Sequence, residues 1–283
     1  MTVSNHRQVL VETDWVESNL GHPNVRLLDV DEDTDAYGRA HIPGALGIHW
    51  KDDLQDPVRR DFIGAAAFAA LMDRLGVGAD TLVILYGGNN NWFAAYAYWY
   101  FRYYGHGPLR LMDGGRKKWE LEKRPLTAEP TQATASAGYI PGSPRHEIRA
   151  LRRFVEEDVV GHPEFGLVDV RSPEEYRGEL LAPPHVPQEQ AQRPGHLPGA
   201  SNIPWASAVD PKTGAFLPDS ELLALYGAQG VTRDREIITY CRIGERSAHT
   251  WFALHELLSY PRVRNYDGSW TEWGSLVGAP IER

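Results

Sequence analysis

The stretch VRLLDVDEDTDAYGRAHIPGALGIHW, residues 25 to 50, occurs twice in this chain, and its repetition decides the fold. It returns between residues 165 and 205 as FGLVDVRSPEEYRG followed by RPGHLPGASNIPW. An insertion, LAPPHVPQEQAQ at residues 181 to 192, separates the two parts of the second copy. Self-similarity over this length indicates that one structural unit is written twice.

The two copies continue to match further along the chain. TLVILYGGNNNWFAAYAYW at 81 to 99 returns as EIITYCRIGERSAHTWFAL at 236 to 254, and RLMDGGRKKWELEKRPL at 110 to 126 as RNYDGSWTEWGSLVGAPI at 264 to 281. An offset of 154 residues relates three identical pairs, which are Tyr86 and Tyr240, Asp113 and Asp267, and Trp119 and Trp273. We therefore predict two domains, residues 1–124 and 146–283, joined by a linker at 125–145.

Within each copy, short apolar runs alternate with helical patterns. The runs at 27–30, 82–86, 167–170 and 237–240 are typical of strands that are buried on both faces of a parallel sheet. The segments 65–75 and 219–228 read as helices, and Ser247 is the expected N-cap of a helix after the strand at 237–240. The predicted fold class is α/β: two tandem domains, each with a central, mostly parallel sheet flanked by helices.

Composition excludes several classes of partner. The 283 residues are 42% hydrophobic and carry a net charge of -9, so we expect neither nucleic acid nor a membrane surface as a partner. The first residues lack a basic segment followed by an apolar one, and the aromatic run at 92–101 is too short to span a bilayer. A single cysteine forms no internal disulfide, which favours a reducing compartment, the cytoplasm.

That cysteine, Cys241, directly follows a predicted strand, whereas the first copy has Gly87 at the same position. A turn containing Gly244 and then a predicted helix follow it, so main-chain N–H groups and the positive end of the helix face the sulfur. A helix N-terminus contributes ~0.3 to 1 kcal/mol and up to ~2, which lowers a thiol pKa from about 8.5 to about 7 to 8. Glu245 would oppose this effect, and we expect its side chain to point away. The pattern predicts a nucleophilic thiolate.

No motif for a cofactor or metal stands out. HELLS at 255–259 lacks the second histidine of a zinc-protease helix, and GVGAD at 76–80 and YGGNNN at 86–91 lack the lysine of a phosphate loop. His41 and His196 precede equivalent turns in both copies, so we assign them structural hydrogen bonds. We predict that the chain uses no cofactor and no metal.

Two tandem α/β units, the turn GHLPGA at 195–200, a Cys-Arg-x-Gly-x-x loop in the second copy alone and DGSW at 267–270 together resemble the two-domain rhodaneses. CRIGERS at 241–247 is most similar to the bacterial thiosulfate sulfurtransferases of that family. The related 3-mercaptopyruvate sulfurtransferases usually carry Cys-Gly-Ser-Gly instead. The resemblance implies that the first domain has lost its cysteine and that the active cleft lies between the domains.

The resemblance also implies the chemistry. Cys241 would attack the outer sulfur of thiosulfate, expel sulfite and become a persulfide, whose sulfur passes to cyanide or to a thiol acceptor such as thioredoxin or a low-molecular-weight thiol. Loop N–H groups would hold the charged sulfur, and arginines would bind the sulfonate. The predicted substrate-binding residues are Arg242, Ile243, Gly244, Glu245, Arg246, Ser247, Arg171 and Arg177.

The sequence departs from the animal thiosulfate enzymes at two positions. Glu175 stands where their pattern has an arginine, and Ile243 where it has a lysine. The cationic role then falls to Arg177 and Arg246. For Arg171, an ion pair with Asp169 is an equal alternative to substrate contact.

Three other functions remain open. The first is transfer from 3-mercaptopyruvate. The second is a cysteine phosphatase, whose loop reads Cys, five residues, Arg; here Ser247 holds the sixth position and the arginine comes one residue early. The third is a non-catalytic binding module, which the restriction of the cysteine to one copy argues against.

Overall fold

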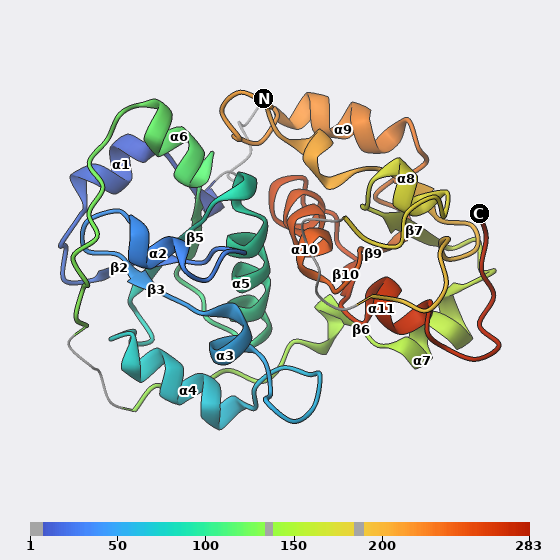
Figure 1. Cartoon of the computed structure of the whole chain (residues 1–283), viewed down its shortest axis with the longest axis horizontal. Coiled ribbons are helices and arrows are strands. Elements are labelled where there is room, and N and C mark those ends of the chain that lie inside the picture. Colours follow the sequence, from blue (N-terminus) through green and yellow to red (C-terminus); the bar gives the residue numbers. More distant parts are fainter. Residues whose placement is uncertain (1–7, 134–137, 184–189) are drawn as a thin grey trace. The chain divides into compact units, whose positions relative to one another are not determined.

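The computed structural model describes residues 8–133, 138–183 and 190–283. The chain forms two compact units, a first unit of residues 1–145 together with 209–216, and a second unit of residues 146–208 together with 217–283. Figure 1 shows each unit as a sheet with helices around it. The predicted linker at 125–145 falls within the first unit, where Thr127 and His41 exchange main-chain hydrogen bonds of 2.8 and 2.9 Å.

The first unit is built on a five-stranded sheet with the order β1-β5-β4-β2-β3. All its strand pairs are parallel. Its strands are β1 (Leu10–Val11), β2 (Val25–Asp29), β3 (Leu46–Gly47), β4 (Leu82–Tyr86) and β5 (Leu109–Met112). Its helices are α1 (Thr13–Ser18), α2 (Ala36–Arg39), α3 (Trp50–Leu54), α4 (Ala65–Arg74), α5 (Trp92–Tyr103) and α6 (Gly115–Leu121).

The second unit repeats this arrangement with the order β6-β10-β9-β7-β8, again parallel throughout. Its strands are β6 (Arg149–Ala150), β7 (Phe165–Asp169), β8 (Ser201–Asn202), β9 (Glu236–Tyr240) and β10 (Val263–Tyr266). Its helices are α7 (Arg152–Phe154), α8 (Pro173–Tyr176), α9 (Asp219–Gly227), α10 (Glu245–Trp251) and α11 (Ser269–Trp273). The predicted fold class is confirmed.

The central strands form because their residues are apolar on both faces. In β4, Val83 to Tyr86 are all fully buried, and in β9 so are Ile237 to Tyr240. A purely parallel sheet needs this, since helices cover both of its faces. Helix α5 packs on β4 and β5, and α10 packs on β9 and β10 (Figure 1). The chain segments that follow β4 and β9 therefore begin at equivalent places.

Identical buried residues fix the turn that follows the second strand of each unit. The hydroxyl of Tyr86 accepts a hydrogen bond from Ile42 N–H at 3.0 Å, and that of Tyr240 accepts one from Leu197 N–H at 3.1 Å. The ring of His41 stacks on Tyr37, and the ring of His196 stacks on Tyr176. Both histidines also make the structural hydrogen bonds expected of them, His41 Nδ1 to the Tyr37 carbonyl and His196 Nδ1 to the Tyr176 carbonyl, each at 2.8 Å.

Two segments complete the description. Of the insertion at 181–192, residues 184–189 lie outside the described residues. The segment Val209–Phe216 closes on itself through an antiparallel bridge between its ends and joins the first unit, where Phe216 N–H donates to Asp113 Oδ1 at 2.9 Å.

Among the described residues, no helix combines the length and apolar character that crossing a bilayer requires.

Candidate active site

Cys241 follows the last residue of β9, and its side chain is fully buried. Its main chain is held by α11: Cys241 N–H donates to Ser269 Oγ at 3.1 Å, and Trp270 N–H donates to the Cys241 carbonyl at 3.0 Å. The next carbonyl, of Arg242, accepts from both the N–H and the hydroxyl of Thr271, at 3.0 and 2.6 Å. The start of the loop is therefore rigidly placed.

Helix α10 begins at Glu245, with Gly244 as its N-cap, so the prediction that Ser247 caps it is wrong by three residues. Gly244 has a φ of +99°, and a Cβ at this position would lie 2.6 Å from the Cα of Asp267. Only glycine can adopt this left-handed backbone so close to the main chain of Asp267. The Gly244 carbonyl accepts from Asn265 Nδ2 at 2.8 Å. The earlier helix start places the first turn of α10 directly against the sulfur.

Main-chain N–H groups converge on the sulfur as predicted. Gly244 N–H donates to Cys241 Sγ at 3.1 Å. Hydrogen bonding by Ser247 acts to lower the pKa of the thiol, and the Ser247 hydroxyl is itself held by Asn265 Oδ1 at 2.6 Å. Such donors stabilise a negative charge on sulfur without a metal.

Glu245 does not point away from the sulfur, which corrects the expectation. Its side chain is buried, and its Oε2 lies 3.4 Å from Cys241 Sγ, where the thiol donates to it. Burial raises the pKa of the Cys241 thiol, and the negative charge of Glu245 raises it further, while Arg246 lowers it. The expected lowering of this pKa is therefore wrong in direction, because burial and the charge of Glu245 outweigh Arg246 and the hydrogen bonds of Ser247.

Arg246 lies in α10 with its side chain almost fully buried. It donates two hydrogen bonds to Glu175, of 2.9 and 3.0 Å. Burial alone would raise the pKa of Glu175, but the hydrogen bonds and charge of Arg246 outweigh it and lower that pKa. Glu175 is placed by a capping box at the start of α8, in which it and Ser172 bond each other's main-chain N–H groups. Glu175, a position at which this sequence departs from the animal thiosulfate enzymes, is therefore paired with Arg246 of the loop.

Arg171 makes the ion pair that the sequence left as one alternative. Its side chain is fully buried, and its Nη2 lies 2.6 Å from Asp169 Oδ2 and 2.7 Å from the Gly195 carbonyl. The guanidinium also lies over the ring of Trp270, 4.8 Å from its centre. A role in substrate contact stays a prediction for this residue.

The remaining candidates differ in exposure. Arg242 and Ile243 are buried in the loop, and Arg242 Nη2 lies 3.9 Å from Glu245 Oε1. Arg177, at the end of α8, is half exposed and pairs with Glu179 at 2.8 Å. The structure thus brings the six loop residues together around the sulfur, while Arg177 is engaged with a surface carboxylate.

Sequence reasoning missed Ser269 and Asn265, which hold the loop from α11 and β10. A signal was present, since at the offset of 154 residues they match Gly115 and Leu111 of the first copy. Polar residues replace a glycine and a leucine only in the copy that has the cysteine. Comparing the two copies position by position would have identified both.

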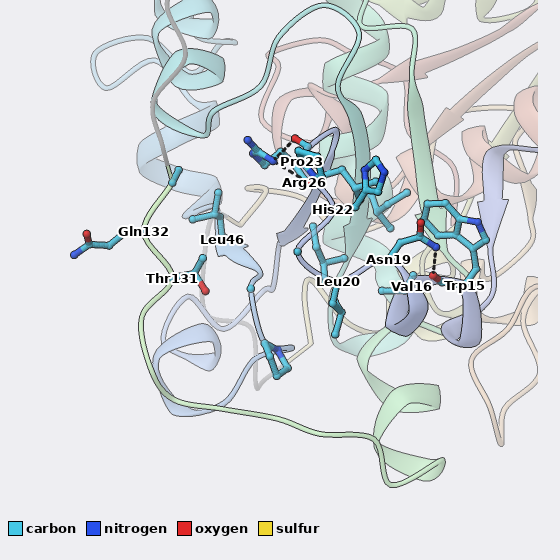
Figure 2. A pocket seen from close by; sticks show the side chains of 17 residues that line it. Trp15, Val16, Asn19, Leu20, His22, Pro23, Arg26, Leu46, Thr131 and Gln132 are labelled. Carbon is cyan, nitrogen blue, oxygen red and sulfur yellow. Dashed lines mark hydrogen bonds between the residues drawn. The ribbon is translucent and has the colours of Figure 1, made fainter.

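A pocket of about 200 Å³ lies elsewhere, in the first unit. Figure 2 shows it between α1, the start of β2 and the segment 131–133, with Trp15, His22 and Arg26 among its lining residues. Arg26 there donates to the Pro23 and Val25 carbonyls, each at 3.0 Å. The lining contains none of the predicted site residues, so this pocket is separate from the cysteine loop. Among the described residues, no group of three or more His, Cys, Asp or Glu side chains is placed to hold a metal ion.

Comparison with known proteins agrees with this geometry. The rhodanese-like domain family matches residues 12–122 and again residues 150–276. A protein of Mycolicibacterium smegmatis named "Putative thiosulfate sulfurtransferase" is 57% identical over 97% of both chains. A Thermus thermophilus protein named "Sulfur carrier protein TtuD" is 55% identical over 98% of both chains.

A solved structure shares the fold at much lower identity. The anaerobic ergothioneine biosynthesis enzyme of Chlorobium limicola, in complex with trimethyl histidine, superposes with a TM-score of 0.83 at 22% identity. The match covers 98% of this chain and 71% of that one. At this identity the likeness supports the fold alone.

Proposed function

Because this chain belongs to the rhodanese-like family of sulfurtransferases, we propose that it is a thiosulfate sulfurtransferase that carries sulfur as a persulfide on Cys241. One observation carries the proposal. The single thiol of the chain lies at the carboxyl end of a central strand, within a hydrogen-bonding loop of Gly244 and Ser247. Donors in this arrangement stabilise a sulfur anion.

The first half-reaction forms one sulfur–sulfur bond and breaks another. The Cys241 sulfur attacks the outer sulfur of thiosulfate, and the bond between that sulfur and the sulfonate sulfur breaks. Sulfite leaves with the bonding electron pair, and the terminal sulfur of the new persulfide carries the negative charge. In the second half-reaction cyanide or a thiol, such as thioredoxin or a low-molecular-weight thiol, attacks that terminal sulfur, and Cys241 leaves as thiolate.

Arginines supply the positive charge for the sulfonate. We assign this role to Arg242 and Arg246, since both lie in the loop beside Cys241. Guanidinium groups suit oxyanions because their N–H donors bind two oxygens at once. Arg171 and Arg177 stay secondary candidates, since both lie outside the loop that holds Cys241; a carboxylate engages each of them, as Glu175 engages Arg246. The single unpaired thiol fits action in the cytoplasm, where thiol acceptors are abundant.

The name of the Thermus relative favours a second candidate, sulfur delivery to a protein. The same persulfide would serve it, with a protein thiol or another nucleophile as acceptor. If 3-mercaptopyruvate were the sulfur donor instead of thiosulfate, the same persulfide would form on Cys241. A phosphatase is less well supported, since the sixth residue after Cys241 is Ser247 and the loop arginine, Arg246, comes one residue too early for a phosphate-binding loop.

Intact mass measurement tests the proposal. After incubation with thiosulfate the protein should gain the mass of one sulfur atom, and cyanide should remove it. Cys241→Ser should show no gain. A gain with 3-mercaptopyruvate but none with thiosulfate would transfer the assignment to the other donor, and release of phosphate from an aryl phosphate would favour the phosphatase.

A further inference from the structure

Glu245 is the one ionisable side chain of the loop with no part in the chemistry described above. Its Oε2 is 3.4 Å from Cys241 Sγ, within hydrogen-bonding distance for sulfur, and only 2% of its side chain is exposed. Cys241 is fully buried. In the first copy the matching residue is Asn91, which does not ionise. A carboxylate and a thiol therefore share one enclosed space in the second unit only.

Most of the charged groups around this pair are already engaged with each other. Arg246 bonds Glu175 of α8, Arg171 bonds Asp169 of β7, and Asp267, whose Cα lies against Gly244, pairs with Arg149 at 2.9 Å. From the loop itself, Arg242 Nη2 lies 3.9 Å from Glu245 Oε1. His249, the other titratable group of α10, packs against Trp205 at 5.2 Å between ring centres. Cys241 and Glu245 thus lie side by side as two acidic groups, and the thiol donates its hydrogen bond to Glu245 Oε2.

We propose that Glu245 is a catalytic residue that takes the proton of the Cys241 thiol as thiosulfate reacts; this inference rests on the proposed function. The proton moves from Sγ to Oε2, and the electron pair left on sulfur forms the bond to the outer sulfur of thiosulfate. The bond between the two thiosulfate sulfurs breaks, and sulfite departs with its electron pair. The products are the persulfide anion, protonated Glu245 and sulfite, so proton and charge balance.

Keeping this proton within the site has an electrostatic reason. The Cys241 and Glu245 pair with one proton carries a single negative charge, and it still does so after the persulfide has formed. Without the proton the pair would carry two negative charges in a buried place, facing a dianionic substrate, and like charges in such a place repel strongly. The reactive state of the enzyme is therefore the one that retains the proton.

The pH dependence of sulfur loading separates this role from a packing role. Wild-type protein and Glu245→Gln are mixed with excess thiosulfate, and the gain of one sulfur is followed by intact mass at a series of pH values. The wild-type rate should be level through neutral pH and fall in alkali, as the pair loses its proton. In Glu245→Gln the charge of Glu245 no longer raises the pKa of the thiol, but burial, the larger cause, still does. With no internal proton acceptor for that thiol, the rate should be about a hundredfold lower at neutral pH and should rise with pH.

Two further variants complete the experiment. Glu221→Gln removes an exposed carboxylate of α9 in the same unit and should keep the wild-type profile. Glu245→Asp keeps a carboxylate and should keep the fall in alkali, which gives a result even where Glu245→Gln does not fold. Wild-type rate and profile in Glu245→Gln, or a rate that rises with pH in Glu245→Asp, would overturn the role of Glu245. Absence of any sulfur gain in the wild-type protein would instead overturn the proposed function.

Discussion

The loop after β4 and the loop after β9 occupy the same place in two copies of one fold, but only the second is organised around a side chain that can react. In the first unit, Asn91 fills the loop: its Oδ1 accepts from Gly87 N–H at 2.9 Å, and its Nδ2 donates to the Met112 carbonyl at 2.6 Å. Asp31 also accepts from Gly88 N–H. The N–H groups of the first two loop residues, Gly87 and Gly88, are therefore bonded to the chain's own side chains.

In the second unit a residue outside the loop makes the hydrogen bond to the first loop N–H group. Ser269 Oγ accepts from Cys241 N–H, as Asn91 Oδ1 accepts from the matching Gly87 N–H in the first unit. Gly244 N–H donates to the sulfur. Gly115, the counterpart of Ser269, has no room for a side chain, since a Cβ there would lie 2.2 Å from Asn91 Oδ1. The absence of a cysteine in the first copy thus goes together with a different hydrogen-bond network around the loop.

The buried charges differ in the same way. Arg116 in the first unit is shared between Asp29 and Asp31, at 2.6 and 2.9 Å, while Arg171 in the second pairs with Asp169 alone. Burial and the nearby charge of Asp31 raise the pKa of Asp29 to about 7. Asp29 and Asp169 are equivalent carboxylates, whereas Asp31 and Arg116 of the first unit stand where the second unit has Arg171 and Trp270.

The largest expected effect tests whether a thiol alone could convert the first unit. Gly87→Cys, introduced together with Cys241→Ser, should give no sulfur gain from thiosulfate by intact mass. A Cβ at residue 87 would lie 2.2 Å from the Val30 carbonyl oxygen, which forces the backbone to move, and Asn91 would still occupy the loop. A gain of one sulfur in this double variant would show that the network around the loop is not what separates the two copies.

The next effect concerns the pair of Glu175 and Arg246, which is specific to the second unit. Glu175→Ala leaves Arg246 buried without its carboxylate and should lower the free energy of unfolding by about 3 to 5 kcal/mol. Exposed Glu174 is the matched control, and Glu174→Ala should change stability by less than about 0.5 kcal/mol. Urea unfolding measures both.

The same pair has a pH signature. Because the pKa of Glu175 is lowered on folding, its stabilisation is present above its unfolded pKa of about 4.3 and is lost as the pH falls through the lower folded value. The stability gap between wild type and Glu175→Ala should therefore shrink in acid. A gap that stays constant down to pH values below both pKa values would contradict the ion pair.

The smallest effect distinguishes Ser269 from its counterpart Gly115. Ser269→Ala removes the acceptor of Cys241 N–H and should cost about 1 to 3 kcal/mol. Ser269 has a φ of +52°, so Ser269→Gly should recover about 1 to 2 kcal/mol of that loss, because glycine adopts this backbone without penalty. Thermal melting compares the two, and a glycine variant no more stable than the alanine variant would argue against strain at this position.

Much of the fold could be predicted from the sequence, because repetition and buried apolar runs are local patterns. The strands at 82–86 and 237–240 and the helices at 65–74 and 219–227 lie where those patterns indicate. The position of Cys241 at a strand end could likewise be predicted from the first copy. These features depend on which residues are adjacent, and the sequence displays that directly.

The orientation of charged side chains could not be predicted in this way. Glu245 turns toward the sulfur because α10 begins at Glu245, two residues before the expected cap. Arg246 bonds Glu175, a residue 71 positions away along the chain, and this partner depends on how α8 and α10 pack. Such pairings are set by tertiary structure, so local patterns predict the residue types of the site but not their partners.

One feature, the solitary cysteine, has a consequence for redox chemistry. With no second thiol among the 283 residues, a sulfur atom held on Cys241 cannot be discharged by closing a disulfide within the chain. Every turnover must then end on an external nucleophile, and oxidised forms of the residue likewise depend on an outside reductant for repair. Because the Cys241 side chain is fully buried, its sulfur is shielded from solvent until an external nucleophile or reductant reaches it.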